Sequence, residues 1–125
     1  MRMTENKRRI LEALRAPESE HERIERTMPP YSASSVARWL QLDRHNVART
    51  LRNMAEVGLV IPDVQWVDVW ADGLKSTRGR SGLVRKQLTC YWCADTLEAD
   101  RAAVAEWEAG REERCNAVLD KLARL

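Results

Sequence analysis

Residues 32–58 carry the pattern that most constrains the fold, namely two short amphipathic helices joined by a tight turn. The first is expected to run through Gln41, because serines at positions 32, 34 and 35 offer N-caps for it. Its apolar residues share one face. These are Val36, Ala37 and Leu40.

The second helix of the pair is expected over residues 44–56, with Asp43 as its N-cap and Gly58 placed to end it. Its apolar residues have the i, i+4, i+7 spacing of a buried stripe. These are Val47, Leu51 and Met54. The residues that lie away from this stripe are His45, Asn46, Arg49, Arg52 and Asn53. One face is therefore expected to be buried, while the other offers hydrogen-bonding side chains.

The segments on either side complete a mainly helical pattern. A first helix is expected over residues 4–15, with Thr4 as its N-cap and Pro17 just beyond its end. Its apolar stripe consists of Ile10, Leu11 and Leu14. Residues 16–31 are expected to form a loop, with at most one helical turn at 22–27.

A β-hairpin is expected between residues 59 and 92, because two runs rich in Val, Ile, Trp and Leu flank a turn-prone segment. Pro62 would occupy a bend or an unpaired edge position. The expected tip, residues 74–86, contains five basic residues and no acidic one. The basic residues are Lys75, Arg78, Arg80, Arg85 and Lys86.

The chain from Asp95 to Leu125 is expected to be one helix, with Asp95 and Glu98 in capping-box spacing and Gly110 as its weak point. Such a helix is about 46 Å long, whereas a globule of this size is about 36 Å across. Its overhanging stripe predicts a homodimer. The expected dimerization residues are Leu97, Val104, Trp107, Val118, Leu122 and Leu125. In the alternative, Gly110 breaks the helix and both pieces fold back on the core.

Residues 35–60, SVARWLQLDRHNVARTLRNMAEVGLV, resemble the helix-turn-helix and strand entry of winged-helix transcription regulators of the MarR and PadR type. The matching residues are Ala37, Leu40, Leu42, Asp43, Val47, Leu51, Met54 and Gly58-Leu59-Val60. One departure is Gln41, where these families commonly have a left-handed glycine. Either the turn is more helical here, or it carries about 1 to 2 kcal/mol of strain.

The resemblance and the residue pattern together give a fold expectation. It is a mainly α protein with a small β-hairpin, a winged helix-turn-helix with a long C-terminal dimerization helix. Residues 1–94 would form the DNA-binding domain and residues 95–125 the dimerization element.

The expected function is sequence-specific binding of double-stranded DNA by a dimeric transcription repressor that reads a palindromic site. The exposed face of the helix 44–56 carries Arg and Asn, which pair with guanine and adenine in the major groove. Base reading is assigned to His45, Asn46, Arg49, Arg52 and Asn53, with Arg44 and Thr50 on phosphates. The wing would add Lys75, Arg78 and Arg80, the two arginines being candidates for the minor groove.

Two other functions fit the same pattern. One is a plasmid or phage centromere or replication protein that binds DNA with this fold. The other is a winged helix used for protein interaction, with its basic wing facing an acidic partner. The DNA target, the regulated gene or replicon, and the choice between repressor, activator and partition protein do not follow from the sequence.

Two clusters suggest further sites but favour simpler interpretations. Cys90 and Cys93 have the spacing of half a zinc site, yet on a strand they point to opposite faces and lack further ligands nearby. Packing is therefore expected for them, without a metal, and Cys115 is expected in the core. Four tryptophans, Trp66, Trp70, Trp92 and Trp107, could line an effector pocket, but core packing is the simpler expectation.

Composition limits the remaining classes. The chain has 125 residues with 44% hydrophobic and 32% charged, enough for one compact domain and a core. Three cysteines are an ordinary number of reduced thiols. With no membrane-spanning stretch and no signal segment, a cytoplasmic protein is expected. No catalytic motif, cofactor site or membrane contact is expected.

Overall fold

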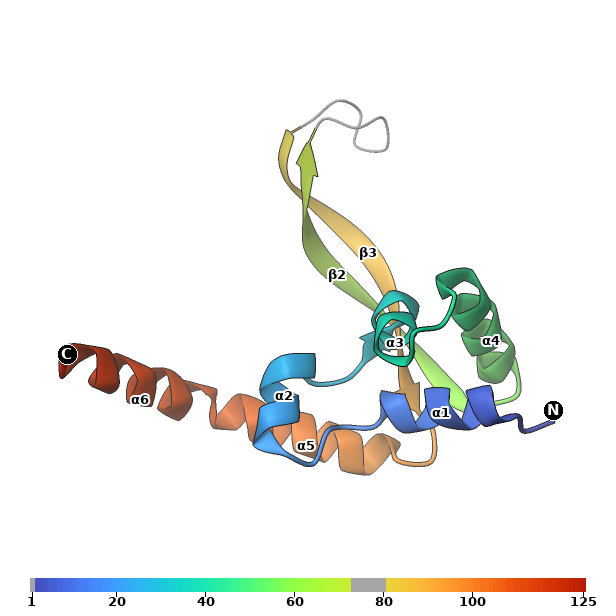
Figure 1. Cartoon of the computed structure of the whole chain (residues 1–125), viewed down its shortest axis with the longest axis horizontal. Helices are drawn as coiled ribbons and strands as arrows, with labels where there is room; N and C mark the ends of the chain where they lie inside the picture. Colours follow the sequence, from blue (N-terminus) through green and yellow to red (C-terminus); the bar gives the residue numbers. More distant parts are fainter. Residues whose placement is uncertain (1, 73–80) are drawn as a thin grey trace.

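The computed structural model describes residues 2–72 and 81–125. This part of the chain is mainly helical, with a three-stranded antiparallel sheet and a long C-terminal helical segment. The elements are α1 (Glu5–Leu14), α2 (Glu20–Arg26), β1 (Tyr31–Ser32), α3 (Ala33–Leu40), α4 (Arg44–Glu56), β2 (Val60–Asp72), β3 (Ser81–Cys93), α5 (Leu97–Ala109) and α6 (Arg111–Ala123). Figure 1 shows the β2–β3 hairpin rising from a base of helices, with α6 extending to one side.

Three helices begin at the N-caps that the sequence predicts. Thr4, Ser32 and Asp43 each accept a hydrogen bond from the backbone N–H three residues later, at 3.0–3.3 Å. Each bond satisfies a backbone donor that has no partner within its helix. These side chains therefore set where α1, α3 and α4 start.

The core lies where α1, α3 and α4 meet the base of the sheet. It contains the predicted stripe of α4, several apolar residues of α1 and α3, one residue of β1, and three residues of β2 and β3. Its buried members are Ile10, Ala13, Leu14, Tyr31, Val36, Ala37, Val47, Leu51, Met54, Val60, Tyr91 and Cys93. Burial of these residues is what positions α4 on the body.

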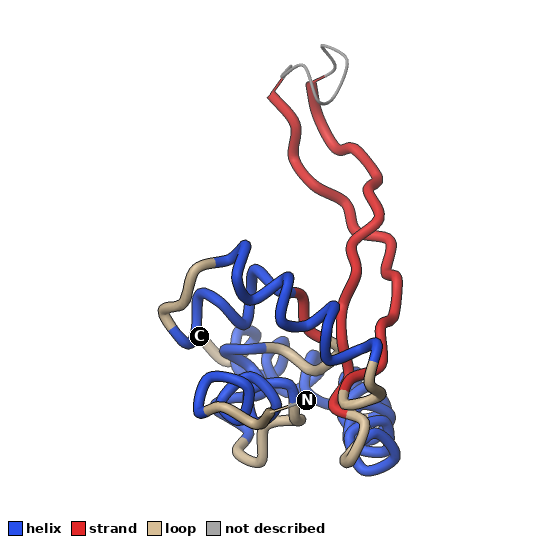
Figure 2. Tube along the Cα trace, turned by 90° about the vertical axis from the view of Figure 1, so that its right-hand side faces the viewer, coloured by secondary structure: helices blue, strands red, loops and turns tan. Residues whose placement is uncertain are grey.

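The sheet has the strand order β1-β3-β2. Strands β2 and β3 pair along their whole length, from Val60 opposite Cys93 to Asp72 opposite Ser81. Strand β1 pairs only with residues 90 and 91 of β3. Beyond that short strand the sheet is a two-stranded ribbon that stands clear of the helices (Figure 2).

Two expectations for residues 16–31 are wrong. This segment contains the helix α2, capped by Ser19, whose side chain accepts the Glu22 N–H at 3.2 Å. Its last residue, Tyr31, begins strand β1, which the predicted order of three helices, two strands and one helix leaves out. Strand β1 forms because its two residues pair with the edge of β3, about 60 residues later in the chain. A strand of two residues has no local sequence pattern that would predict such a pairing.

The expected bounds of the hairpin tip also need correction. Residues 81–86 belong to β3, where Arg85 faces Asp68 and Lys86 faces Val67. These two basic residues therefore belong to the paired part of the β2–β3 hairpin and not to its tip. The other expected tip residues, Lys75, Arg78 and Arg80, lie outside the described residues.

The C-terminal helical segment is long, and Gly110 divides it into α5 and α6. Helical hydrogen bonding continues across the division, from Gly110 N–H to the Glu106 carbonyl and from Arg114 N–H to the Gly110 carbonyl, both at 3.1 Å. The alternative in which both pieces fold back is wrong, because α6 has no buried residue. The expected Asp95 capping box is also absent, since Thr96 is the N-cap of α5 and makes no side-chain cap bond.

Candidate nucleic-acid interface

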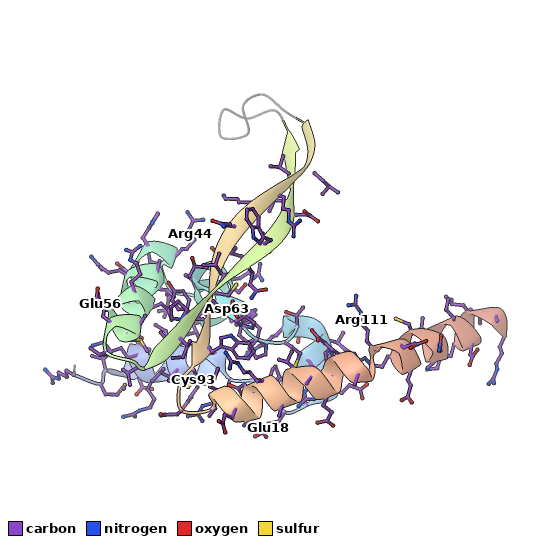
Figure 3. All side chains as sticks on the ribbon, turned by 180° about the vertical axis from the view of Figure 1, so that it is seen from behind. Glu18, Arg44, Glu56, Asp63, Cys93 and Arg111 are labelled. Carbon is purple, nitrogen blue, oxygen red and sulfur yellow. The ribbon has the colours of Figure 1, made fainter. Side chains whose placement is uncertain are left out.

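Helix α4 is held by one face. Val47, Leu51 and Met54 are buried, as the spacing predicts, and they pack with α3 and the base of the sheet. Helix positions advance by about 100° per residue, so the side opposite this stripe faces away from the body. Figure 3 labels Arg44 and Glu56 at the two ends of α4, with the Arg44 end toward the side on which the hairpin rises.

The turn before α4 has a left-handed residue. Gln41 has φ 56° and ψ 44°, and the backbone N–H groups of Gln41 and Leu42 both donate to the Ala37 carbonyl. Of the two alternatives for this turn, the strained one is therefore correct, at about 1 to 2 kcal/mol for a residue with a Cβ. The geometry commonly filled by glycine is kept here by glutamine.

Arg9 of α1 stabilises the same turn, and the sequence reasoning missed it. Its Nη2 donates to the carbonyl oxygen of Leu40 at 3.2 Å, which ties α1 to the last residue of α3. The two residues are 31 positions apart. No local signal marks such a contact, because a surface-type arginine on an amphipathic helix has the same pattern whether or not it finds a distant carbonyl.

The structure places the predicted base-reading residues on one open surface. His45, Asn46, Arg49, Arg52 and Asn53 are all exposed, and so is Arg44. Thr50 differs, because it is half-buried and lines a cavity of about 90 Å³ beside Asn6 and Ile10 of α1. Thr50 therefore lies on the flank of α4 that faces the body.

The arginines of this surface keep their charge available. No ion pair joins Arg44, Arg49 or Arg52 to a carboxylate within the part of the chain that the structure describes. Arg49 makes one side-chain hydrogen bond, from Nη2 to Oδ1 of Asn46 at 2.7 Å. A surface with unpaired guanidinium groups is suited to an external anion or to acceptor atoms on another molecule.

The ribbon of β2 and β3 carries exposed apolar side chains, among them Trp66, for which the expectation of core packing is wrong. Trp66 is 57% exposed and stacks under the Arg85 guanidinium, which lies 5.4 Å from the ring centroid. Val64 and Leu83 are also exposed. The alternation that predicts the strands also predicts that every second side chain points to the same face of the ribbon. Which of the two faces is exposed depends on the residues that pack against the base of the sheet.

The cysteines are in three environments. Cys90 and Cys93 are both buried and lie opposite Asp63 and Val60, which places them on opposite faces of the ladder. Burial raises the pKa of the Cys90 thiol, and the nearby Asp63 carboxylate adds to that rise. Cys115, expected in the core, is instead exposed, because α6 does not pack on the body. Among the described residues there is no group of three His, Cys, Asp or Glu that could hold a metal ion.

The tryptophans do not form one cluster. Trp92 is buried and donates from Nε1 to Oδ2 of Asp63 at 3.0 Å, whereas Trp107 is half-buried under Arg114, 3.5 Å from the ring centroid. Trp66 is exposed on the ribbon, and the side chain of Trp70 is not among those that the structure describes. Since each described ring has its own partners, a shared pocket for a flat effector has no support.

The predicted dimerization residues divide into two groups. Leu97, Val104 and Trp107 are half-buried within their own chain, and the last two line a cavity with Arg23 and Met28 beside α2. Val118, Leu122 and Leu125 are 58%, 59% and 99% exposed. Before Gly110 the apolar stripe therefore lies beside α2, whereas after Gly110 its side chains are exposed to solvent.

Comparisons of the chain with protein families, with curated proteins and with solved structures found no match. No helix within residues 2–72 and 81–125 is both long and apolar enough to cross a membrane.

Proposed function

We propose that this protein binds double-stranded DNA sequence-specifically through α4, in a winged helix-turn-helix fold. The observation that carries the proposal is the division of α4 into a fully buried apolar stripe and an opposite face of exposed Arg, Asn and His that ends at Glu56, where the arginines make no ion pair with any described residue. Residues 1–94 would be the DNA-binding domain, and residues 95–125 the dimerization element.

The dimensions of α4 support this function. With 13 residues it is about 20 Å long, and a helix with side chains is about 10 to 12 Å wide. The major groove is about 12 Å wide and presents a distinct pattern of donors and acceptors for each base pair. An exposed helix of this size, held from behind by its apolar face, can enter the groove without disturbing its own core.

The hairpin supports a second contact with the same duplex. It rises toward the side of the Arg44 end of α4 (Figures 1 and 3), and Arg85 and Lys86 are exposed along it. Basic side chains beside a recognition helix add phosphate contacts that position the protein. In this assignment the ribbon lies along the backbone while α4 reads bases.

A homodimer is part of the proposal, with its interface confined to the open half of the C-terminal segment, which contains three of the six expected residues, Val118, Leu122 and Leu125. On α6, Val118, Leu119 and Leu122 are about 60% exposed, and Ile24 of α2 is 66% exposed beside them. A helix of 13 residues with no buried residue is marginal in water on its own. A second α6 would cover this face.

An antiparallel pairing of the two α6 helices brings Glu112 and Glu113 of one helix toward Lys121 and Arg124 of the other, with Arg111, Arg114 and Asp120 in the same two turns. It also opposes the two helix dipoles. With one two-fold axis, both α4 helices would read a roughly palindromic site, and occlusion of a promoter is the simplest regulatory mechanism.

The test is a titration of labelled random-sequence duplex, followed at increasing salt. Binding through several phosphates should lose affinity log-linearly, with a slope of about 0.9 per phosphate contacted. Arg49→Ala should cost about 1 to 3 kcal/mol on a selected site, whereas Arg101→Ala, which removes an exposed arginine of α5 outside both α4 and the proposed dimer face, should leave the affinity unchanged. If binding survives high salt, or if Arg49→Ala binds like the wild type, α4 is not the recognition helix.

A further inference from the structure

The side chains of α4 that point away from the buried stripe form two rows. Positions 45, 49, 52 and 56 lie opposite the stripe when each residue advances by about 100°. Positions 46, 50 and 53 lie on the flank toward α1, where Asn46 and Thr50 line the cavity beside Asn6. Arg49 is thus the middle of the outward row, and Asn46 stands beside it on the flank.

One hydrogen bond joins the two rows. Arg49 Nη2 donates to Asn46 Oδ1 at 2.7 Å, a short contact in which the donor is charged. Asn46 itself sits in the first turn of α4, where its backbone N–H donates to the Asp43 cap at 3.0 Å. The acceptor is therefore held at the fixed end of the helix, and the long arginine side chain is oriented toward it.

This bond leaves the two side chains with unequal capacity to read a base. An arginine has five N–H donors, so four remain on Arg49, enough for a forked contact to two acceptors. A two-pronged contact of asparagine to adenine needs both its oxygen and its nitrogen turned to the base. The Asn46 oxygen already accepts the bond from the Arg49 guanidinium. The oxygen side of the amide therefore points toward Arg49 on the same helix and not toward a base.

We infer that Arg49 reads a guanine in each half-site and that Asn46 is a positioning residue, which holds the arginine in its forked orientation and does not read adenine. This inference rests on the proposed function, because it assigns the base that the same helix recognises. Guanine is the base whose O6 and N7 acceptors in the major groove match the arginine fork. Asn46 acts through Arg49 and touches no base.

The experiment is selection of bound duplexes from a random pool, done in parallel for the wild type, Asn46→Ala, Asn46→Asp, Arg49→Ala and Arg52→Ala. The wild type should enrich guanine at one fixed position per half-site, by roughly 5- to 150-fold over other bases. Arg49→Ala should lose that preference. Asn46→Ala should weaken the preference at the same position by about threefold, with thermal unfolding measured to show that the variant is folded.

Two variants separate positioning from other roles. Asn46→Asp keeps an acceptor for Arg49, so the guanine preference should be retained while affinity for every duplex falls through repulsion from phosphates. Arg52→Ala, on the same outward row but without the Asn46 bond, should keep the preference at the Arg49 position. A merely structural role of Asn46 would lower affinity without changing the preference at one base.

The outcomes distinguish this inference from the proposal on which it rests. If Asn46→Ala abolishes preference for an adenine at a separate position and leaves guanine unchanged, Asn46 reads a base and the inference is wrong. If the wild type binds duplex but selects no guanine that depends on Arg49, the inference also fails and DNA binding stands. If the wild type binds no duplex, both fail.

Discussion

The carboxylate of Asp100, in α5, accepts a hydrogen bond from the backbone N–H of Ala16, just beyond α1, at 3.1 Å. The other carboxylate oxygen accepts a bond from the Thr96 hydroxyl at 2.7 Å. Asp100 is only 5% exposed. This residue therefore fastens the start of the C-terminal segment to the body that carries α4.

Asp100→Ala should destabilise the protein by about 1 to 3 kcal/mol, because it leaves the Ala16 N–H without its partner in a part-buried site. The measurement is urea unfolding, together with hydrogen exchange at Ala16, which should become faster. Asp95→Ala is the matched control on an exposed neighbour and should change little. Equal stability of the two variants would show that the contact does not hold α5.

The two turns that flank α4 predict opposite effects of glycine. Gln41→Gly should relieve about 1 to 2 kcal/mol of left-handed strain and lose up to about 1 kcal/mol through the freer unfolded chain, for a small net gain in stability. Gly58→Ala should cost about 1 kcal/mol, because Gly58 has φ +80°. A Cβ there would meet no atom within 4 Å, so backbone strain would be the source of this cost and not a steric clash. Thermal unfolding of both variants checks the signs, and a stabilised Gly58→Ala would contradict the strain argument.

Stability should fall at high pH through Tyr31. Burial raises the pKa of its phenol above the ordinary value of 10.0, although Arg26 acts in the opposite direction. The folded state therefore keeps a proton that the unfolded chain releases, so the stabilisation is complete below about pH 10 and is lost as pH rises further.

The comparison that tests this uses Tyr31→Phe, which cannot ionise at that position. Between about pH 10 and pH 11 the wild type should lose about 1 kcal/mol more unfolding free energy than the variant. Parallel curves for the two proteins would exclude Tyr31 as the source. The variant also loses the bond from the Tyr31 hydroxyl to the Thr27 carbonyl at 2.7 Å, which lowers its stability at every pH.

The three thiols should react in a defined order. Cys115 is exposed, whereas Cys90 and Cys93 are buried and the pKa of Cys90 is raised by burial and by Asp63. Iodoacetamide at neutral pH should modify Cys115 about tenfold faster than the other two, because attack needs an accessible thiolate. Mass spectrometry of peptides measures the order. Faster labelling of Cys90 than of Cys115 would contradict the burial of β3 at its base.

Leu122→Glu should separate the subunits without unfolding them. Leu122 is 59% exposed in the single chain, so the change removes no intrachain packing, but in the proposed dimer it buries a charge. Sedimentation should show a dimer for the wild type and a monomer for the variant, with the same unfolding curve at high dilution. A monomeric wild type at micromolar concentration would overturn the dimer.

Much of the part of the molecule that carries α4 could be predicted from local pattern. The caps at Thr4, Ser32 and Asp43 and the buried stripe of α4 follow from side-chain chemistry within one or two helical turns. The exposure of Arg49 and Asn46 follows from the same periodicity. Their hydrogen bond does not, because periodicity places residues on a face without choosing rotamers.

The sequence by itself determined where α1, α3 and α4 begin, which face of α4 is buried, and that a hairpin follows Gly58, since each depends on neighbours in the chain. Only the tertiary structure decided that β1 pairs with β3, that Arg9 reaches the end of α3, and that Trp107 turns to α2 while Leu122 stays open. Those contacts join residues far apart in sequence, and their free energy exists only once the chain has brought them together.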